Sequence, residues 1–337
     1  MTVILGIESS CDETAAAIIM NGKLLANVVV EQEVHKKWGG VVPELASRAH
    51  QQNIVPVIDQ TLALAGIKAN DIDGVAFTRG PGLLGSLLVG ASFAKAFALA
   101  LGKPLLEVNH MQAHILSHFI EDSIKRDRPE FPFLCLTVSG GHTQLVRVDD
   151  FKTFSIIGQT IDDAAGETFD KTAKILGLPY PGGPLVDKLA KEGNSKAFKF
   201  PIAQIPGMDF SFSGLKTAIL YFVRDELKKD STFLEKQMAN ICASVQYTIV
   251  KTLLDRVEMA MKQTGINQIA LAGGVSANTE LRASIQELGK KNNWSVFIPP
   301  IEYCTDNAAM IAMNGYLKFL ENNFVGQDIA PSARLQL

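Results

Sequence analysis

The same arrangement of apolar runs and turns occurs twice in this 337-residue chain. The first copy spans Val3–Ile19 and the second spans Phe133–Val148, and each consists of an apolar run, a turn of small and polar residues and another apolar run. This pattern is typical of two β-strands joined by a tight turn. A chain that repeats one hairpin in this way is predicted to fold as a duplicated α/β protein with two lobes and a cleft between them.

Helical patterns separate the predicted strands. The apolar stretch Leu84–Leu101 contains Lys95 and two glycines, so we interpret it as a buried helix and not as a membrane span. Further helices are predicted over residues 112–121, 162–176, 213–229, 232–263, 279–291 and 307–320. Phe131-Pro132 is the expected junction. The first lobe then comprises residues 1–131, to which the segment 307–337 returns, and the second comprises residues 132–306.

Composition narrows the class of protein. The chain is 47% hydrophobic and 20% charged, as is usual for a soluble globular enzyme. Its four cysteines form no Cys-x-x-Cys pair and the N-terminus has no signal pattern, so we expect a cytoplasmic protein without disulfides or a zinc ribbon. The net charge of −3 gives no global affinity for nucleic acid, and any RNA contact needs a local basic patch or a partner.

A histidine pair is the strongest indication of a metal. His110 and His114 are spaced i, i+4, which places both imidazoles on one face of a helix, and a distant carboxylate such as Asp306 can complete a three-ligand site. His118 follows His114 at the same interval, so spacing alone does not choose between the two pairs. Zinc proteases share this spacing, but Met111 stands where they carry the catalytic Glu. The pattern therefore favours a metal that positions a substrate over one that drives hydrolysis.

Three glycine-rich turns follow apolar segments, at Val138–Thr143, Tyr180–Pro184 and Ala272–Val275. Glycine allows backbone N–H groups to approach a phosphate or a purine closely. Each turn alone is more often a simple chain reversal, but three in one duplicated fold indicate a nucleotide site. The chain has neither a Walker A lysine motif nor a Gly-x-Gly-x-x-Gly fingerprint, which disfavours P-loop and Rossmann folds.

Acidic residues supply the remaining candidate chemistry. Asp12 and Glu13 lie in the first hairpin turn, where a phosphate or leaving group is expected; the alternative is that Asp12 caps the turn and Glu13 is solvated. Asp170 lies within a predicted helix and either contacts substrate or pairs with Lys174 at i+4. Asp187 follows the Gly-Gly turn and either accepts hydrogen bonds from ribose hydroxyls or caps a helix.

Taken together, the motifs closely resemble those of the bacterial TsaD family of tRNA adenosine threonylcarbamoyltransferases. The resemblance covers nearly the whole chain, in order, and Thr137 is a minor departure at a position that is often apolar in the family. The matching motifs are Ile4–Thr14, Gly39–Arg48, the His110/His114 pair, Val138–Thr143, Phe210–Thr217 and Ala272–Asn278.

The resemblance implies an α/β fold of the actin/Hsp70/sugar-kinase (ASKHA) type. It implies metal ligands at His110, His114 and Asp306, holding one divalent ion between the lobes, iron(II) or alternatively zinc. The substrate contacts that it implies are Thr137, Val138, Ser139, Gly140, Gly141, Asp170, Gly183, Asp187 and Asn278.

The reaction implied is transfer of a threonylcarbamoyl group from threonylcarbamoyl-AMP to N6 of the adenosine 3′ of the anticodon, in tRNAs that read codons beginning with A. Glu13, with Asp12, is expected to accept the proton or orient the acyl group. The implied partners are the paralogue TsaB and the ATPase TsaE, without a membrane.

Three other functions fit part of the pattern. They are a metalloprotease, as an older name of the family suggests, an ATP-dependent phosphotransferase on the same fold, and a non-catalytic paralogue. Met111 argues against the protease. The histidine pair argues against Mg²⁺-ATP, because magnesium prefers oxygen ligands. The intact motifs argue against a non-catalytic protein.

Overall fold

Each repeated hairpin forms the centre of a five-stranded sheet in the computed structural model, which describes all 337 residues except the side chain of Lys36. The first sheet has the order β3 (Lys23–Glu31), β2 (Glu13–Met20), β1 (Val3–Glu8), β4 (Gly74–Gly80), β5 (Leu105–Asn109). The second has the order β8 (Phe154–Gln159), β7 (Thr143–Val148), β6 (Phe133–Val138), β9 (Gln268–Ala272), β10 (Ser295–Phe297).

Strand directions correspond between the two sheets. In the first, β1 pairs antiparallel with β2 and parallel with β4; in the second, β6 pairs antiparallel with β7 and parallel with β9. The outer strands continue the same pattern, β3 and β8 antiparallel and β5 and β10 parallel. The duplicated α/β fold predicted from the hairpins is therefore confirmed.

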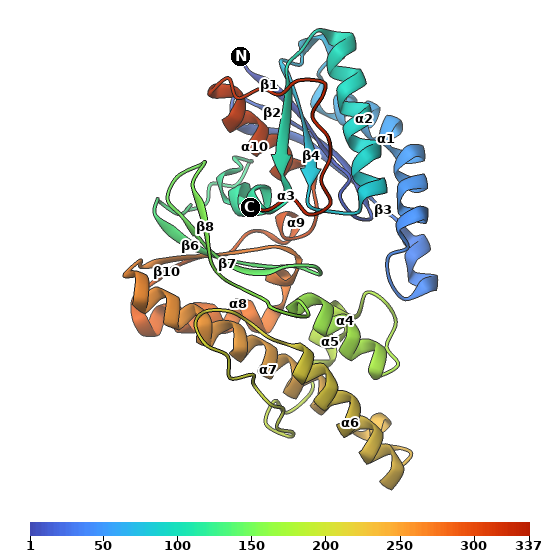
Figure 1. The fold of residues 1–337 in the computed structure, drawn as a ribbon, viewed down its shortest axis with the longest axis vertical. Helices are drawn as coiled ribbons and strands as arrows, with labels where there is room; N and C mark the ends of the chain where they lie inside the picture. The colour runs from blue at the N-terminus through green and yellow to red at the C-terminus, as the bar shows by residue number, and fades with distance from the viewer. The chain divides into compact units, whose positions relative to one another are not determined.

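The helices connect and cover these sheets (Figure 1). The first sheet is accompanied by α1 (Pro43–Ala65), α2 (Leu84–Leu101), α3 (His110–Leu116), α9 (Ile301–Cys304) and α10 (Ala308–Leu320), with 3-10 turns at Glu33–Trp38, Ala69–Asp71 and Ser117–Phe119. The second is accompanied by α4 (Ala165–Ile175), α5 (Gly182–Ala190), α6 (Ser213–Lys229), α7 (Phe233–Thr264) and α8 (Thr279–Asn292), with a 3-10 turn at Gly274–Ala277.

The chain divides into unit 1, Met1–Arg128 with Pro299–Leu337, and unit 2, Pro129–Ile298. This division differs from the expected lobes because residues 299–306 belong to unit 1. The tyrosine of α9 anchors them there, since Tyr303 Oη donates a hydrogen bond of 3.0 Å to Asp122 Oδ2. Asp306 therefore lies in the same unit as the histidine pair, and not in the second lobe.

Alternation along β1 explains how unit 1 covers both faces of its sheet, because successive side chains of a strand point to opposite faces. Val3, Leu5 and Ile7 share a core with residues of α1 and α2. Ile4, on the other face, shares a core with Met310 of α10. By length and composition α2 also resembles a membrane span, yet it packs on β4 and α1, in accord with the expected role as a core helix.

Gly6 explains how closely α10 approaches the sheet. A Cβ at Gly6 would lie 2.5 Å from the backbone nitrogen of Ala312 and 2.7 Å from the carbonyl oxygen of Ala308, distances that no side chain tolerates. The absence of a side chain lets α10 lie directly on β1. This contact fixes the segment just before α10, which contains Asp306, within unit 1.

In unit 2, helices enclose the core on one face of the sheet. Leu134, Leu136 and Val138 of β6 share a core with Phe169 of α4 and with residues of α6, α7 and α8. All of these side chains are almost completely buried. The loops between β6, α4, α5 and α8 therefore rest on a rigid base.

Candidate functional site

Two buried histidines and one partly exposed aspartate lie together within unit 1. His110 and His114 occupy the first turns of α3, which follows directly on β5, and Asn109 caps the helix by accepting hydrogen bonds from the backbone N–H groups of Met111 and Gln112. Asp306 immediately precedes Asn307, which caps α10 in the same way. Two capped helix starts thus present three ligand atoms to one point.

The distances in this group suit a metal ion. His114 Nε2 lies 3.1 Å and His110 Nε2 lies 3.4 Å from Asp306 Oδ1, and one ligand atom from each side chain lies within 4.8 Å of the others. A tetrahedral site with metal–ligand bonds of 2.0–2.1 Å has ligand–ligand separations of about 3.3 Å. An ion can therefore enter with little rearrangement. This metal-capable group contains His110 and not His118.

Two carboxylates determine the charge of His110. Burial lowers the pKa of His110, but Asp306 and Glu8 outweigh burial and raise it well above 6.5. Burial opposes ionisation of Asp306 as well, yet the two histidines bring its pKa below its ordinary range. The pKa of His114 is lowered, chiefly by burial, so this ring is a neutral ligand. His110 thus faces a carboxylate on each side, with Nδ1 toward Glu8 and Nε2 toward Asp306.

The acidic turn of the first hairpin lies in the same unit. Burial raises the pKa of Glu13 well above its usual value, and the charges of Asp306, Asp12 and Glu8 raise it further. Glu13 is therefore close enough to the metal-capable group to respond to its charge. His50 of α1 holds the turn from behind, with Nε2 3.0 Å from the Cys11 carbonyl oxygen and Nδ1 2.8 Å from Thr14 Oγ1.

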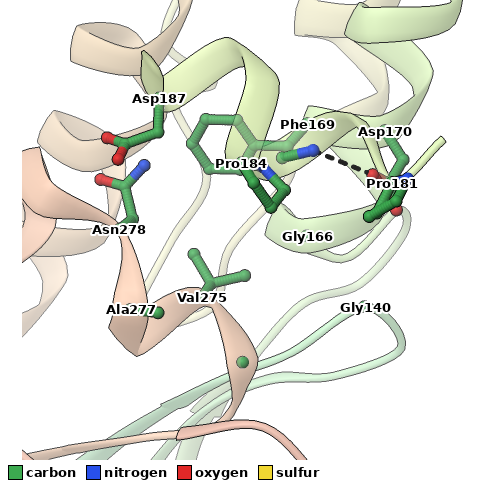
Figure 2. A pocket seen from close by; sticks show the side chains of 12 residues that line it. Gly140, Gly166, Phe169, Asp170, Pro181, Pro184, Asp187, Val275, Ala277 and Asn278 are labelled. Atoms are coloured by element: carbon green, nitrogen blue, oxygen red, sulfur yellow. Dashed lines mark hydrogen bonds between the residues drawn. The ribbon is translucent and has the colours of Figure 1, made fainter. Parts of the chain in front are cut away.

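Unit 2 contains a cavity of about 310 Å³. Five of the predicted substrate contacts line it, and Figure 2 shows Asp187 and Asn278 next to each other, with Asp170 further along the cavity wall. The size is at the lower end of the range for small-molecule sites. The predicted residues that line the cavity are Gly140, Asp170, Gly183, Asp187 and Asn278.

Asp170 holds the turn that forms one wall of this cavity. Its Oδ1 accepts hydrogen bonds from the backbone N–H groups of Gly182, at 2.9 Å, and Gly183, at 3.1 Å. These are the first two residues of α5, whose N-cap Pro181 offers no side-chain cap. Asp170 thus caps α5 from another helix. Burial raises its pKa, and the two N–H groups oppose that rise.

Asp187 and Asn278 join α5 to the start of α8. Asp187 Oδ1 accepts hydrogen bonds from the hydroxyl and the backbone N–H of Thr279, at 2.8 and 3.2 Å. Asn278 caps α8 through Leu281 N–H and donates from Nδ2 to Gln246 Oε1 at 2.7 Å. The capping role weighed for Asp187 is present in the structure, and it fixes this side chain at the cavity wall.

The other predicted contacts are placed differently. Thr137 and Val138 are buried in β6, and the Ser139 hydroxyl accepts the backbone N–H of His142 to close the turn. Gly141 lies in that turn, and neither it nor these three residues are among those that line the cavity. The sequence interpretation missed the following lining residues: Gly166, Phe169, Pro181, Pro184, Gly274, Val275 and Ala277. The turns at 180–184 and 272–275 pointed to four of them.

Comparison with solved structures defines the class of protein. HypF, solved in a phosphate- and nucleotide-bound form, matches with a TM-score of 0.60 at 15% identity, over 95% of this chain and 56% of HypF. Component A of (R)-2-hydroxyglutaryl-CoA dehydratase from Acidaminococcus fermentans matches with a TM-score of 0.55 at 16% identity, over 94% and 99% of the two chains. With two corresponding α/β units, the chain has the actin/Hsp70/sugar-kinase fold, as expected.

Sequence comparison then identifies the family within this class. The model of the TsaD family, tRNA N6-adenosine threonylcarbamoyltransferase, matches residues 23–313. The enzymes of that name from Christiangramia forsetii and Cytophaga hutchinsonii are 59% and 55% identical to this chain. They cover 98% and 99% of it, and the matches span 97% and 96% of their own lengths. The chain therefore belongs to the TsaD family and is a tRNA-modifying transferase, so the expected enzyme class is confirmed over protease and phosphotransferase.

Proposed function

We propose that this enzyme transfers the threonylcarbamoyl group of threonylcarbamoyl-AMP to N6 of the adenosine 3′ of the anticodon, in tRNAs that read codons beginning with A. Membership of the family supplies the reaction type. The observation that carries the proposal furthest is the group formed by buried His110, buried His114 and partly exposed Asp306, whose separations match those of a metal polyhedron.

The AMP part of the donor is assigned to the cavity of unit 2. Phe169, Pro184 and Val275 offer apolar surface to a purine, and Asp187 offers an acceptor to ribose hydroxyls. Gly140 has open space where a Cβ would lie, so a ligand can approach its backbone closely. Capping by Asp170 keeps the opposite wall in place before the donor binds.

The metal is assigned as iron(II), with zinc as the alternative, because two imidazoles and one carboxylate with open positions suit both ions. When bound, the ion supplies Lewis-acid stabilisation to oxygens of the donor. His110, His114 and Asp306 hold it, and the burial of both histidines excludes competing solvent.

Glu13 and Asp12 are assigned to the proton that leaves N6 and to the acyl group. An adenine amine is a weak nucleophile, so positioning and charge stabilisation supply most of the rate. As N6 attacks the carbamoyl carbon, the bond to the AMP phosphate breaks, and Glu13 accepts the proton that N6 loses. Burial raises the pKa of Glu13, and this makes its carboxylate a stronger base than that of an exposed Glu. Asp12 orients the acyl group beside it.

The partners TsaB and TsaE belong to this proposal, as does a cytoplasmic location. An exposed apolar stripe on α2 supports docking of the paralogue TsaB on unit 1 through a helical contact. Leu84, Leu88 and Leu99 are 51%, 47% and 69% exposed, and their spacing places them within about 60° of one another around the helix. A helix face of this kind is what a partner helix covers.

The test uses purified protein, threonylcarbamoyl-AMP, unmodified tRNA and the two partners, with mass spectrometry of the nucleosides as the readout. Threonylcarbamoyl-adenosine is expected, and Glu13→Gln is expected to lose most turnover while it keeps its metal content and nucleotide affinity. A metal-replete Glu13→Gln enzyme with full turnover would remove Glu13 from the mechanism. Chelator-sensitive release of peptides by the wild type, without modified adenosine, would overturn the function itself.

A further inference from the structure

Glu8 is a completely buried carboxylate at the end of β1. Its Oε1 accepts the backbone N–H of Ser10, and its Oε2 accepts the hydroxyl of Thr78 at 2.6 Å. The same Oε2 lies 3.2 Å from His110 Nδ1. Burying a charge is costly unless it is hydrogen-bonded, and these contacts offset that cost for the Glu8 carboxylate.

The contact to His110 determines which ring nitrogen is free. An ionised carboxylate only accepts hydrogen bonds, so the nitrogen that faces it must carry the hydrogen. In the neutral ring, His110 then has Nδ1–H toward Glu8 and an unprotonated Nε2. That Nε2 is the atom 3.4 Å from Asp306 Oδ1, on the metal side of the ring.

From this geometry we propose that Glu8 is a positioning residue, which fixes His110 in the orientation and tautomer that offer Nε2 to the metal. The inference rests on the proposed metal site and adds a residue that acts through His110 without touching the ion. Carboxylates behind metal-bound histidines play this part in other metal sites.

The contacts of Ser10 and His114 show which ligand Glu8 acts on. Ser10 Oγ also lies 3.2 Å from His110 Nδ1, but a hydroxyl both donates and accepts, so it fixes no tautomer. His114 has a buried Nδ1 without a hydrogen-bond partner in the described part of the chain. Glu8 therefore acts on one ligand of the pair, and His110 is the ligand whose orientation is set in advance.

Glu8→Gln is the decisive substitution because it preserves volume and hydrogen bonding. The amide oxygen can accept from Ser10, which leaves the amide nitrogen to face Thr78 Oγ and His110 Nδ1. A donor at that position requires Nδ1 to accept. The hydrogen of the ring then moves to Nε2, where it blocks the metal. The substitution therefore inverts the tautomer without changing the volume of the side chain.

The experiment measures zinc affinity by competition with a chromophoric chelator. We expect Glu8→Gln to bind zinc about 10–100-fold more weakly than the wild type, the usual effect of losing such a partner. Ser10→Ala is the matched control for the other contact of Nδ1, and Glu107→Gln, a hydrogen-bonded carboxylate of β5, is the control for lost charge. Both are expected to stay within threefold of the wild type.

A measurement on the wild type tests the tautomer of His110 even if Glu8→Gln does not fold. In zinc-loaded protein labelled with ¹⁵N-histidine, NMR should show hydrogen on Nδ1 of His110 and metal on Nε2. Metal on Nδ1 would overturn the inference, and so would wild-type affinity in folded Glu8→Gln or an equal loss in Ser10→Ala. If the wild type binds no zinc or iron, the proposed metal site itself fails, which is a distinguishable result.

Discussion

Removing the carboxylate of Asp170 tests whether a cap from a neighbouring helix holds the cavity wall. In Asp170→Ala, the N–H groups of Gly182 and Gly183 lose their acceptor at the start of α5. Hydrogen bonds to charged groups contribute about 1.5–3 kcal/mol each, which sets an upper bound of about 3–6 kcal/mol. Because Asp170 is only partly buried, water replaces part of this, and we expect about 2–3 kcal/mol, slightly above a typical single N-cap.

Asp170→Asn separates the cap from the charge. Asparagine keeps an acceptor for both N–H groups, and the raised pKa of Asp170 shows that burial already disfavours the ionised form. We therefore expect a loss below about 1 kcal/mol. The direction of the pH dependence follows from the raised pKa of Asp170 in the folded state. The free energy of unfolding of the wild type, relative to Asp170→Asn, falls as pH rises through that pKa.

The assay can be confined to unit 2. The chain has two tryptophans, Trp38 in unit 1 and Trp294 in unit 2, so Trp38→Phe leaves fluorescence that reports on unit 2 alone. Guanidinium unfolding in that background gives the free energy change, and calorimetry with AMP gives the effect on the cavity. If Asp170→Ala unfolds within 0.5 kcal/mol of its parent and still binds AMP normally, the capping argument is refuted.

Three other outcomes are expected. His114→Ala should lose bound metal while His118→Ala retains it, as measured by elemental analysis, and equal loss in both would contradict the ligand set. Gly140→Val should abolish AMP binding in calorimetry with unchanged metal content, because the side chain enters the space that the ligand needs; unchanged AMP affinity would make this loop a simple turn. The pKa of His50 is lowered, mainly by burial, so the unfolded state takes up its proton first. The contribution of His50 to the free energy of unfolding is therefore complete above pH 6.5. Below pH 6.5 the free energy of unfolding falls by at most about 1.4 kcal/mol per pH unit. Denaturation curves of His50→Gln should lack this dependence on pH.

The parts of the fold that follow from local pattern were predictable. Alternating apolar runs identified both hairpins, and helical periodicity placed α6 and α8 within one residue of their ends. By contrast, α5 was missed because Pro181, Gly182 and Gly183 resemble a turn. The helix begins inside that turn since Asp170, twelve residues earlier, supplies its cap.

Local sequence pattern predicted less of the candidate functional site than of the fold. Spacing found His110 and His114, because both lie on one short helix, but Asp306 was expected in the second lobe and belongs to unit 1. Its place in unit 1 depends on the close contact of α10 with Gly6, which no local pattern reveals. Glu8 was not recognised as a site residue for a similar reason. Its contacts, to Thr78 and His110, lie 70 and 102 residues away in sequence.

The discontinuity of unit 1 has a consequence for the order in which the protein matures on the ribosome. Unit 2 is one continuous segment, whereas the sheet of unit 1 is synthesised first and α10 last. The face of that sheet with Ile4 and Leu106 stays uncovered while the 170 residues from Pro129 to Ile298 are made, roughly 10–30 s at bacterial rates. Nascent chains therefore expose this apolar surface until α10 has been made. The proposed metal site is complete only after Asp306 has emerged, which would make metal loading one of the last steps of biogenesis.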